Sequence, residues 1–168
     1  MNIVLIGMRG SGKTTVAKIL AQKLQKKYVE TDELIVQKMG MSIPKIIANH
    51  DWNYFRDIES EVIIEISKKD NSVISTGGGV VVRPENIRAL KKHGKLFWLQ
   101  VSVNTLLKRI GDDQNRPSLT GKKSRKEDME ETLKQRYQQY LKASDETINT
   151  ENISTQQVAK KIMLKLKE

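Results

Sequence analysis

The sequence predicts an α/β fold in which a five-stranded parallel sheet lies between two layers of helices. Apolar segments of strand length alternate with segments of helical periodicity along the whole chain, which is the pattern of a parallel sheet with crossover helices. A length of 168 residues suits one domain with one core. We therefore expect residues 1–168 to form a single domain, and we find no internal repeat.

The first predicted elements are a buried strand and its crossover helix. Residues 2–6 are apolar without alternation and rich in β-branched side chains, which predicts a buried strand. In residues 14–24 the apolar side chains recur on one helical face. A second strand is predicted over residues 27–31, and the helix that follows it is expected to end at Gly40.

Further helices precede the third strand. Ser42 is suited to cap a helix that has Pro44 in its first turn. Residues 55–69 carry apolar side chains at helical spacing, and residues 72–76 form the third predicted strand. A helix that opens near Pro84 leads to the second half of the chain.

The second half supplies the last two strands. Residues 95–101 predict a fourth strand and residues 146–150 a fifth, weaker one. The lysine-rich segment 158–168 has apolar residues at every fourth position, which predicts a C-terminal helix with a solvated basic face.

Charge and composition narrow the class of partner. The net charge is +10, which suits either nucleic acid or small anionic molecules. Only 5% of the residues are aromatic, and no basic stretch is interleaved with the rings that single-stranded nucleic acid would stack on. We therefore expect small anions, with no nucleic acid and no membrane as partners.

The sequence also bears on location and metal chemistry. It contains no cysteine and two histidines, which excludes disulfides and thiolate ligands and leaves little for a zinc site. We find no signal-peptide pattern and no apolar run of membrane-spanning length, and so we expect a soluble, cytoplasmic protein.

Residues 7–14, GMRGSGKT, match the phosphate-binding motif G-x-x-x-x-G-K-[ST] in full, between a predicted strand and a predicted helix. The glycines let backbone N–H groups turn toward phosphate oxygens, and the N-terminus of the helix adds partial positive charge. Lys13 can reach the β- and γ-phosphates, and the Thr14 hydroxyl can ligate Mg²⁺. A tight turn without a ligand is the alternative, but the complete motif favours ATP. We expect the loop to be exposed, so that Lys13→Ala leaves the fold intact.

Two carboxylates follow the second predicted strand. The third strand ends in VISTGGG, which has no carboxylate, whereas Glu30 and Asp32 come at the end of the second. Two residues apart in an extended chain, they are expected to point to the same side and to serve a metal ion and a substrate. The alternative is that Asp32 caps the following helix.

Three glycines, Gly77, Gly78 and Gly79, follow the third strand. Each costs roughly 0.5–1 kcal/mol of backbone entropy relative to alanine, and ligands bind at the carboxyl ends of parallel strands. Close approach of a ligand to the backbone is favoured over an irregular loop.

Residues 111–124, GDDQNRPSLTGKKS, are almost free of apolar side chains and too long for a passive connection. They are interpreted as a lid, with a disordered loop as the alternative.

The chain resembles the shikimate kinase family from its first strand to its last helix. The segments that carry the resemblance are GMRGSGKTT, VETDELI, FRDIESE, STGGG, RIGDDQNRPSL and RYQQYLKASDETINT. The phosphate motif is generic, whereas the arginine of FRDIE, the triple glycine and RPSL in this order are specific among small P-loop kinases. The resemblance implies a three-layer P-loop fold with a substrate-binding helical region at about residues 32–65.

The resemblance also implies a reaction. The chain would transfer the γ-phosphoryl of ATP to the 3-hydroxyl of shikimate, a step in aromatic amino-acid biosynthesis, with one Mg²⁺ ion per subunit. We expect a monomer. The rival readings are another small-metabolite kinase of the same fold, similar to gluconate kinase, and a nucleotide-dependent nucleic-acid-binding module.

Particular residues receive roles from the resemblance. Lys13, Asp32 and Arg116 are expected to be catalytic, with Asp32 facing the substrate hydroxyl and Arg116 coming from the lid. Shikimate would be bound by Asp32, Arg56, Gly77, Gly78, Gly79 and Arg136. The nucleotide would be bound by Gly10, Ser11, Gly12, Lys13, Thr14, Thr15, Arg109 and Arg116. The metal ion would be held by Thr14 and, through water, by Glu30.

Alternatives and departures accompany these roles. Arg56 could instead form a surface ion pair with Glu59, and Arg136 could be a solvated helix residue. The family usually has Asp-x-Asp after the second strand, so Glu30 is one methylene longer than the usual metal-side carboxylate. Ser118 stands where the family usually has a leucine, which bears on how a closed lid would pack.

Overall fold

A computed structural model describes residues 1–111, 118, 120–121 and 124–167. Within these residues, five strands form one sheet in the order β2-β3-β1-β4-β5, and all four neighbouring pairs are parallel. The strands are β1 (Asn2–Ile6), β2 (Lys27–Glu30), β3 (Ser72–Ser75), β4 (Gly94–Gln100) and β5 (Glu146–Asn149). The predicted α/β fold with a five-stranded parallel sheet is confirmed.

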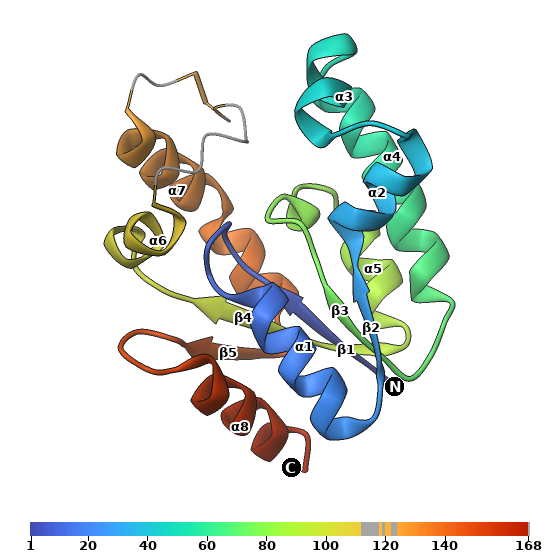
Figure 1. Ribbon diagram of the computed structural model, residues 1–168, viewed down its shortest axis with the longest axis vertical. Coiled ribbons are helices and arrows are strands. Elements are labelled where there is room, and N and C mark those ends of the chain that lie inside the picture. The colour runs from blue at the N-terminus through green and yellow to red at the C-terminus, as the bar shows by residue number, and fades with distance from the viewer. Residues whose placement is uncertain (112–117, 119, 122–123, 168) are drawn as a thin grey trace.

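Helices cover both faces of the sheet. They are α1 (Lys13–Leu24), α2 (Thr31–Met39), α3 (Ile43–Asn49), α4 (Trp52–Ser67), α5 (Pro84–Lys91), α6 (Val103–Ile110), α7 (Arg125–Ala143) and α8 (Thr155–Lys165). A 3₁₀ turn, η1 (Val80–Val82), follows β3. Helices α1 and α8 lie against one face, and α4, α5 and α7 lie against the other (Figure 1). No helix in the described part of the chain is both long and apolar enough to cross a bilayer.

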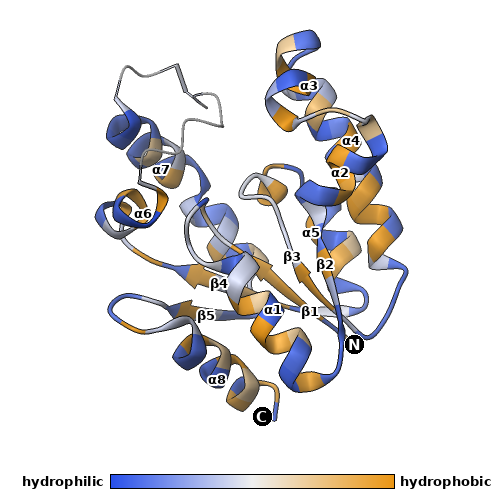
Figure 2. Ribbon diagram, in the orientation of Figure 1, coloured by the Kyte–Doolittle hydropathy of each residue, from blue (hydrophilic) through white to orange (hydrophobic). Residues whose placement is uncertain are grey.

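The central strand β1 divides its side chains between two cores. Ile3 and Leu5 belong to the apolar cluster under α1 and α8, whereas Val4 and Ile6 belong to the cluster under α4, α5 and α7. Such alternation is the consequence of the two-residue period of a strand. Figure 2 shows β1 and β4 in the colour of hydrophobic residues, while α7 is largely hydrophilic. The strand therefore joins the two helical layers into one three-layer structure.

Helix ends follow local signals, with two shifts from expectation. Gly40 adopts φ 65° and ends α2, as predicted. Helix α4 begins at Trp52, earlier than predicted, because Asp51 caps it and accepts a hydrogen bond from the Tyr54 backbone N–H. Helix α2 begins at Thr31, immediately after the last residue of β2. The second shift matters for the site, because it changes the backbone that carries Asp32.

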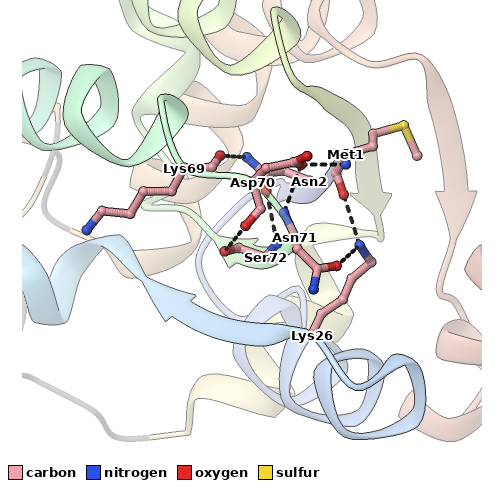
Figure 3. Close-up of polar contacts among 7 residues, drawn as sticks. All are labelled: Met1, Asn2, Lys26, Lys69, Asp70, Asn71 and Ser72. Carbon is pink, nitrogen blue, oxygen red and sulfur yellow. Dashed lines mark hydrogen bonds and ion pairs between the residues drawn. The ribbon is translucent and has the colours of Figure 1, made fainter.

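The amino ends of β1 and β3 are joined by a polar cluster (Figure 3). The side chain of Asn2 is buried; its Nδ2 donates to the Lys69 carbonyl at 2.7 Å, and its Oδ1 accepts from the Ser72 N–H at 2.9 Å. Lys26 Nζ donates to Asn71 Oδ1 at 2.7 Å nearby. The carboxyl ends of the strands, at the opposite edge of the sheet, are left for the site.

Candidate active site

The phosphate loop, residues 7–14, connects β1 to α1 and takes conformations that favour glycine. Gly10 and Gly12 have φ 82° and 93°, the left-handed region that L side chains rarely adopt. Lys13 Nζ donates to the carbonyls of Gly7 and Met8 at 2.8 and 2.9 Å. The Lys13 side chain is buried, so the expectation of an exposed loop is wrong at this residue. Removing its ammonium would leave two loop carbonyls without this donor.

A cavity opens beside this loop, and we call it the phosphate-loop cavity. It is lined by Arg9, Gly10, Gly12, Lys13, Thr14, Thr15, Glu30, Asp32, Glu33, Thr76, Gly77, Gly78, Arg109, Ile153, Ser154 and Thr155. Of the residues that we expected to bind nucleotide, Ser11 is buried and does not line the cavity. Sequence reasoning gave no role to Arg9, which occupies a variable position of the motif, and it missed the start of α8, which no linear motif connects to the loop.

Arg109 is positioned at the wall of this cavity by the loop that follows β5. Its Nη2 donates to the Thr150 carbonyl at 3.1 Å, and its Nη1 lies 3.4 Å from the Ser11 carbonyl. These contacts connect α6 to the phosphate loop and to the segment before α8. The guanidinium is thereby held at one wall of the phosphate-loop cavity.

The carboxylate of Glu30 accepts two hydrogen bonds on the same oxygen. Thr14 Oγ1 and the Tyr28 hydroxyl each lie 2.9 Å from Glu30 Oε2. Burial, and next the charge of Glu30, raise the pKa of Tyr28 above its ordinary value, so the phenol remains a donor. Among the described residues no three histidine or acidic side chains gather as a metal site. Hydroxyl and carboxylate oxygens nevertheless suit Mg²⁺, which keeps waters and takes few protein ligands.

Asp32 lies in the first turn of α2 and not in an extended segment. The argument that Glu30 and Asp32 share one side of an extended chain is therefore wrong in its geometry, because the helix begins at Thr31. Thr31 is buried, and its hydroxyl accepts a hydrogen bond from the Gly77 N–H at 3.0 Å. Both carboxylates still line the phosphate-loop cavity.

A second cavity, which we call the arginine cavity, lies between the helices on the two sides of the carboxyl edge. It is lined by Met8, Arg9, Asp32, Ile43, Ile47, Trp52, Phe55, Arg56, Glu59, Gly77, Gly78, Gly79, Asp128, Met129, Thr132 and Arg136. Asp32, Gly77 and Gly78 line both cavities, as does Arg9. A group transferred between ligands in the two cavities would pass Asp32.

Arg56 and Glu59 form a buried ion pair in the arginine cavity. Their Nη1 and Oε2 atoms lie 2.7 Å apart, and the residues are 8% and 1% exposed. The pair with Glu59 exists, but it is not the surface contact that the spacing suggested. Burial raises the pKa of Glu59 despite the attraction of Arg56. Sequence reasoning considered Glu59 only as a surface partner of Arg56, one turn away, and did not place it in the binding site.

The glycine segment, residues 77–79, packs against charged side chains. A Cβ on Gly79 would overlap the Arg56 guanidinium, and one on Gly77 would lie 2.8 Å from Asp32 Oδ1. The Tyr140 hydroxyl donates to the Gly78 carbonyl at 2.6 Å, and burial raises the pKa of Tyr140 to about 12. Close approach to this backbone was expected, and the groups that approach it here are the protein's own Arg56 and Asp32.

Helix α7 contributes Arg136 to the lining of the arginine cavity. The side chain is half-buried, which differs from the fully solvated alternative.

Arg116 and most of residues 111–124 lie outside the described residues. Ser118 and Thr120 are described, and their hydroxyls lie 2.9 and 2.6 Å from Asp128 Oδ1 on α7. These two contacts join residues of the predicted lid to the rim of the arginine cavity.

Comparisons with known proteins identify the family that the chain resembles in sequence and in fold. The family model for shikimate kinase matches residues 9–167. The chain is 44% identical over 162 residues to the shikimate kinase of Thermodesulfovibrio yellowstonii, covering 96% of this chain and 92% of that protein. It is 40% identical to the shikimate kinase of Sulfurihydrogenibium sp., covering 99% and 98% of the two chains. Shikimate kinase from Acinetobacter baumannii, solved in complex with shikimate, superimposes with a TM-score of 0.93 at 32% identity, covering 98% and 92%.

Proposed function

The chain belongs to the shikimate kinase family, and we propose that its phosphate-loop cavity binds ATP while its arginine cavity binds shikimate. The reaction is transfer of the γ-phosphoryl of ATP to the 3-hydroxyl of shikimate, which gives shikimate 3-phosphate and ADP. The observation that carries the assignment of the two cavities is that Asp32 lines both of them. The similar structure from Acinetobacter baumannii was solved with shikimate, which supports a shikimate site in this fold.

Asp32 is proposed to orient the attacking hydroxyl. Its carboxylate is held beside Gly77 and stands where the phosphoryl group must cross from one cavity to the other. A carboxylate in hydrogen-bond reach of a hydroxyl can fix its direction and accept its proton late in the transfer. The enzyme's residues then contribute by positioning and charge neutralisation, which is the main source of catalysis in phosphoryl transfer.

Arg56 and Arg136 are proposed to bind the carboxylate of shikimate. Both line the arginine cavity, Arg56 from α4 and Arg136 from α7, and these two helices stand apart in Figure 1. Guanidinium groups form bidentate hydrogen bonds with carboxylates, and Glu59 fixes one of the two guanidiniums in advance. The glycine segment would allow the ring hydroxyls to approach the backbone. The apolar wall that includes Trp52, Phe55 and Met129 would contact the ring.

The phosphate loop is proposed to hold the ATP phosphates. Its N–H groups and the N-terminus of α1 favour anions, and Lys13 would exchange its carbonyl partners for phosphate oxygens. Thr14 and Glu30 would hold Mg²⁺, directly and through water. When bound, this ion neutralises charge on the β- and γ-phosphates. Arg109 would lie against the adenine, and Arg116 would reach the transferring phosphoryl.

The organisation of the whole chain is proposed as one domain with two substrate-covering regions. Residues 32–65 would enclose shikimate, and residues 111–124 would act as a lid over the nucleotide. Exclusion of water by such a lid protects ATP from hydrolysis. We further propose that the enzyme is a cytoplasmic monomer and that it does not bind nucleic acid.

A single assay separates this proposal from its rivals. Coupled ADP release is measured with shikimate, gluconate, CMP or RNA added separately to the enzyme and Mg·ATP. We expect acceleration with shikimate alone, and Asp32→Asn should remove that acceleration while leaving ATP binding intact. Acceleration by gluconate or CMP, or stimulation by RNA, would contradict the assignment of the arginine cavity.

A further inference from the structure

Tyr28 is the one residue besides Thr14 that hydrogen-bonds the carboxylate of Glu30 in the described part of the chain. Both hydroxyls donate to Oε2, each at 2.9 Å, and Oε1 receives no hydrogen bond from a described residue. Two donors on one oxygen fix the rotation of the carboxylate group. Glu30 also lines the phosphate-loop cavity, so a ligand in that cavity lies within reach of this carboxylate.

The position of Tyr28 is itself set by two elements. Tyr28 and Glu30 are two residues apart on β2, an edge strand, so their side chains lie on the same face of the sheet. The half-buried ring packs against the core under α1, with Lys18 Nζ 5.4 Å from the ring centroid. Thr14 and Lys18 are one turn apart on α1. One face of α1 therefore contacts both the carboxylate and the residue that supports it.

The length of the Glu30 side chain explains why support is needed. Glutamate has one more rotatable bond than aspartate, and ordering it costs more side-chain entropy. A hydrogen bond from a ring that is already packed restricts that rotation before any ligand binds. Because Thr14 directs its hydrogen toward Oε2, its oxygen lone pairs remain available on the other side.

We propose that Tyr28 is a positioning residue for the magnesium ion of Mg·ATP. Its hydroxyl would hold the Glu30 carboxylate in place for a metal-bound water, while the Thr14 oxygen would ligate the ion. The proposal rests on the proposed function, because it takes Thr14 and Glu30 as the metal side of the ATP site. It predicts that Tyr28 acts on the metal ion through Glu30 and has no effect of its own on the nucleotide.

The test uses Tyr28→Phe, which keeps the ring and removes only the hydroxyl. ADP binding is measured by calorimetry with Mg²⁺ and, separately, with a chelator and no metal; Mn²⁺ binding to the ADP complex is measured by electron paramagnetic resonance. We expect the affinity for Mg·ADP and for Mn²⁺ to fall about tenfold, the lower end for loss of a ligand-orienting contact. Metal-free ADP should bind as to the wild type. Tyr54→Phe is the matched control, because Tyr54 stacks on His50 and lines neither cavity.

Variants of Glu30 separate the role of Tyr28 from the assignment of Thr14 and Glu30 as the residues that hold the metal ion. Adding Tyr28→Phe to Glu30→Gln or to Glu30→Asp should change metal affinity by less than about twofold, because the tyrosine then has no long carboxylate to hold. If Glu30→Gln lowers the affinity for the metal ion but Tyr28→Phe does not, the role of Tyr28 is overturned, while the assignment of Thr14 and Glu30 to the metal site is kept. If neither Glu30→Gln nor Thr14→Ala lowers the affinity for the metal ion, the assignment of these two residues to the metal site is wrong. The role of Tyr28 is also overturned if Tyr28→Phe lowers the affinity for metal-free ADP as much as that for Mg·ADP. The same holds if it lowers metal affinity as much in the Glu30→Asp variant as in the wild type.

Discussion

Arg56 Nη1 lies 2.7 Å from Glu59 Oε2, one turn further along α4, and neither side chain is exposed to solvent beyond a tenth of its surface. The guanidinium lies between this carboxylate and the backbone of Gly79, where a methyl group would overlap it. It is therefore fixed before substrate binds. A preformed guanidinium loses less conformational entropy when it captures a carboxylate.

Glu59→Gln is predicted to change both the pH dependence of stability and shikimate binding. Burial raises the pKa of Glu59 from its ordinary 4.5, so the folded state binds more protons than the unfolded state. The stability of the wild type relative to the variant is therefore greatest below pH 4.5 and falls as pH rises through the raised pKa. Urea unfolding at several pH values checks this sign. The KM for shikimate should rise about tenfold, since Arg56 loses a charged hydrogen-bond partner.

Gly79→Ala is predicted to displace Arg56. The backbone of Gly79 has φ −91°, which alanine adopts without strain, so the effect of the methyl group is steric. We expect the free energy of unfolding to fall by about 1–3 kcal/mol, as for overpacking elsewhere. The KM for shikimate should rise more than the KM for ATP. Unchanged shikimate kinetics in the folded variant would show that Arg56 does not bind the substrate.

Arg136→Lys is predicted to weaken shikimate binding selectively, because an ammonium cannot replace a bidentate guanidinium. A hydrogen bond to a charged group contributes about 1.5–3 kcal/mol, which corresponds to at least a tenfold rise in KM. Steady-state kinetics with each substrate varied in turn provide the measurement. Lys134→Ala, a change on the exposed face of the same helix, is the control. A rise confined to the KM for ATP would show that Arg136 acts in nucleotide binding and not in shikimate binding.

Arg116→Ala is predicted to lower kcat while leaving the affinity for ATP nearly unchanged. A cation that meets the phosphoryl group mainly in the transition state contributes to the rate and not to ground-state binding. Arginines in this role are worth roughly a thousandfold or more in other phosphoryl-transfer enzymes. Arg88→Ala on the exposed face of α5 serves as a control. A wild-type kcat would remove Arg116 from the mechanism.

Asn2→Ala is predicted to destabilise the fold without altering catalysis. The substitution removes both partners that the buried Asn2 side chain supplies, at Lys69 and Ser72 (Figure 3). The Ser72 N–H is buried, and leaving it unsatisfied costs about 1–3 kcal/mol, whereas the carbonyl of the exposed Lys69 can bond to water. The melting temperature should fall by several degrees in calorimetry. Because the cluster lies at the amino ends of the strands, kcat and both KM values should stay within twofold of the wild type.

Local patterns predicted the elements of this fold because their causes are local. The apolar run of β1, the phosphate motif before α1 and the stop at Gly40 each depend on a few neighbouring residues. Element boundaries were less accurate. Asp51 moved the start of α4, and α2 begins one residue before its predicted start at Asp32, which removes the extended geometry that was assumed between Glu30 and Asp32.

Reasoning from single residues also misjudged burial. The phosphate loop was expected to be exposed, yet Lys13 is buried over the carbonyls of Gly7 and Met8. The pair of Arg56 with Glu59 was considered as a surface contact and is enclosed. Burial depends on which helices cover a segment, and periodicity within one segment does not report that.

The order of residues along the chain was enough to establish the α/β class, the phosphate loop and the resemblance to shikimate kinases, because all three are written in contiguous stretches. Tertiary structure alone decided that Tyr28 and Thr14 meet on one oxygen of Glu30, that Asp32 lines both cavities, and that α7 presents Arg136 opposite α4. These relationships join segments from different parts of the sequence. They depend on the parallel pairing that brings the carboxyl ends of β1, β2 and β3 to one edge, and on side-chain directions that packing sets only once the sheet is assembled.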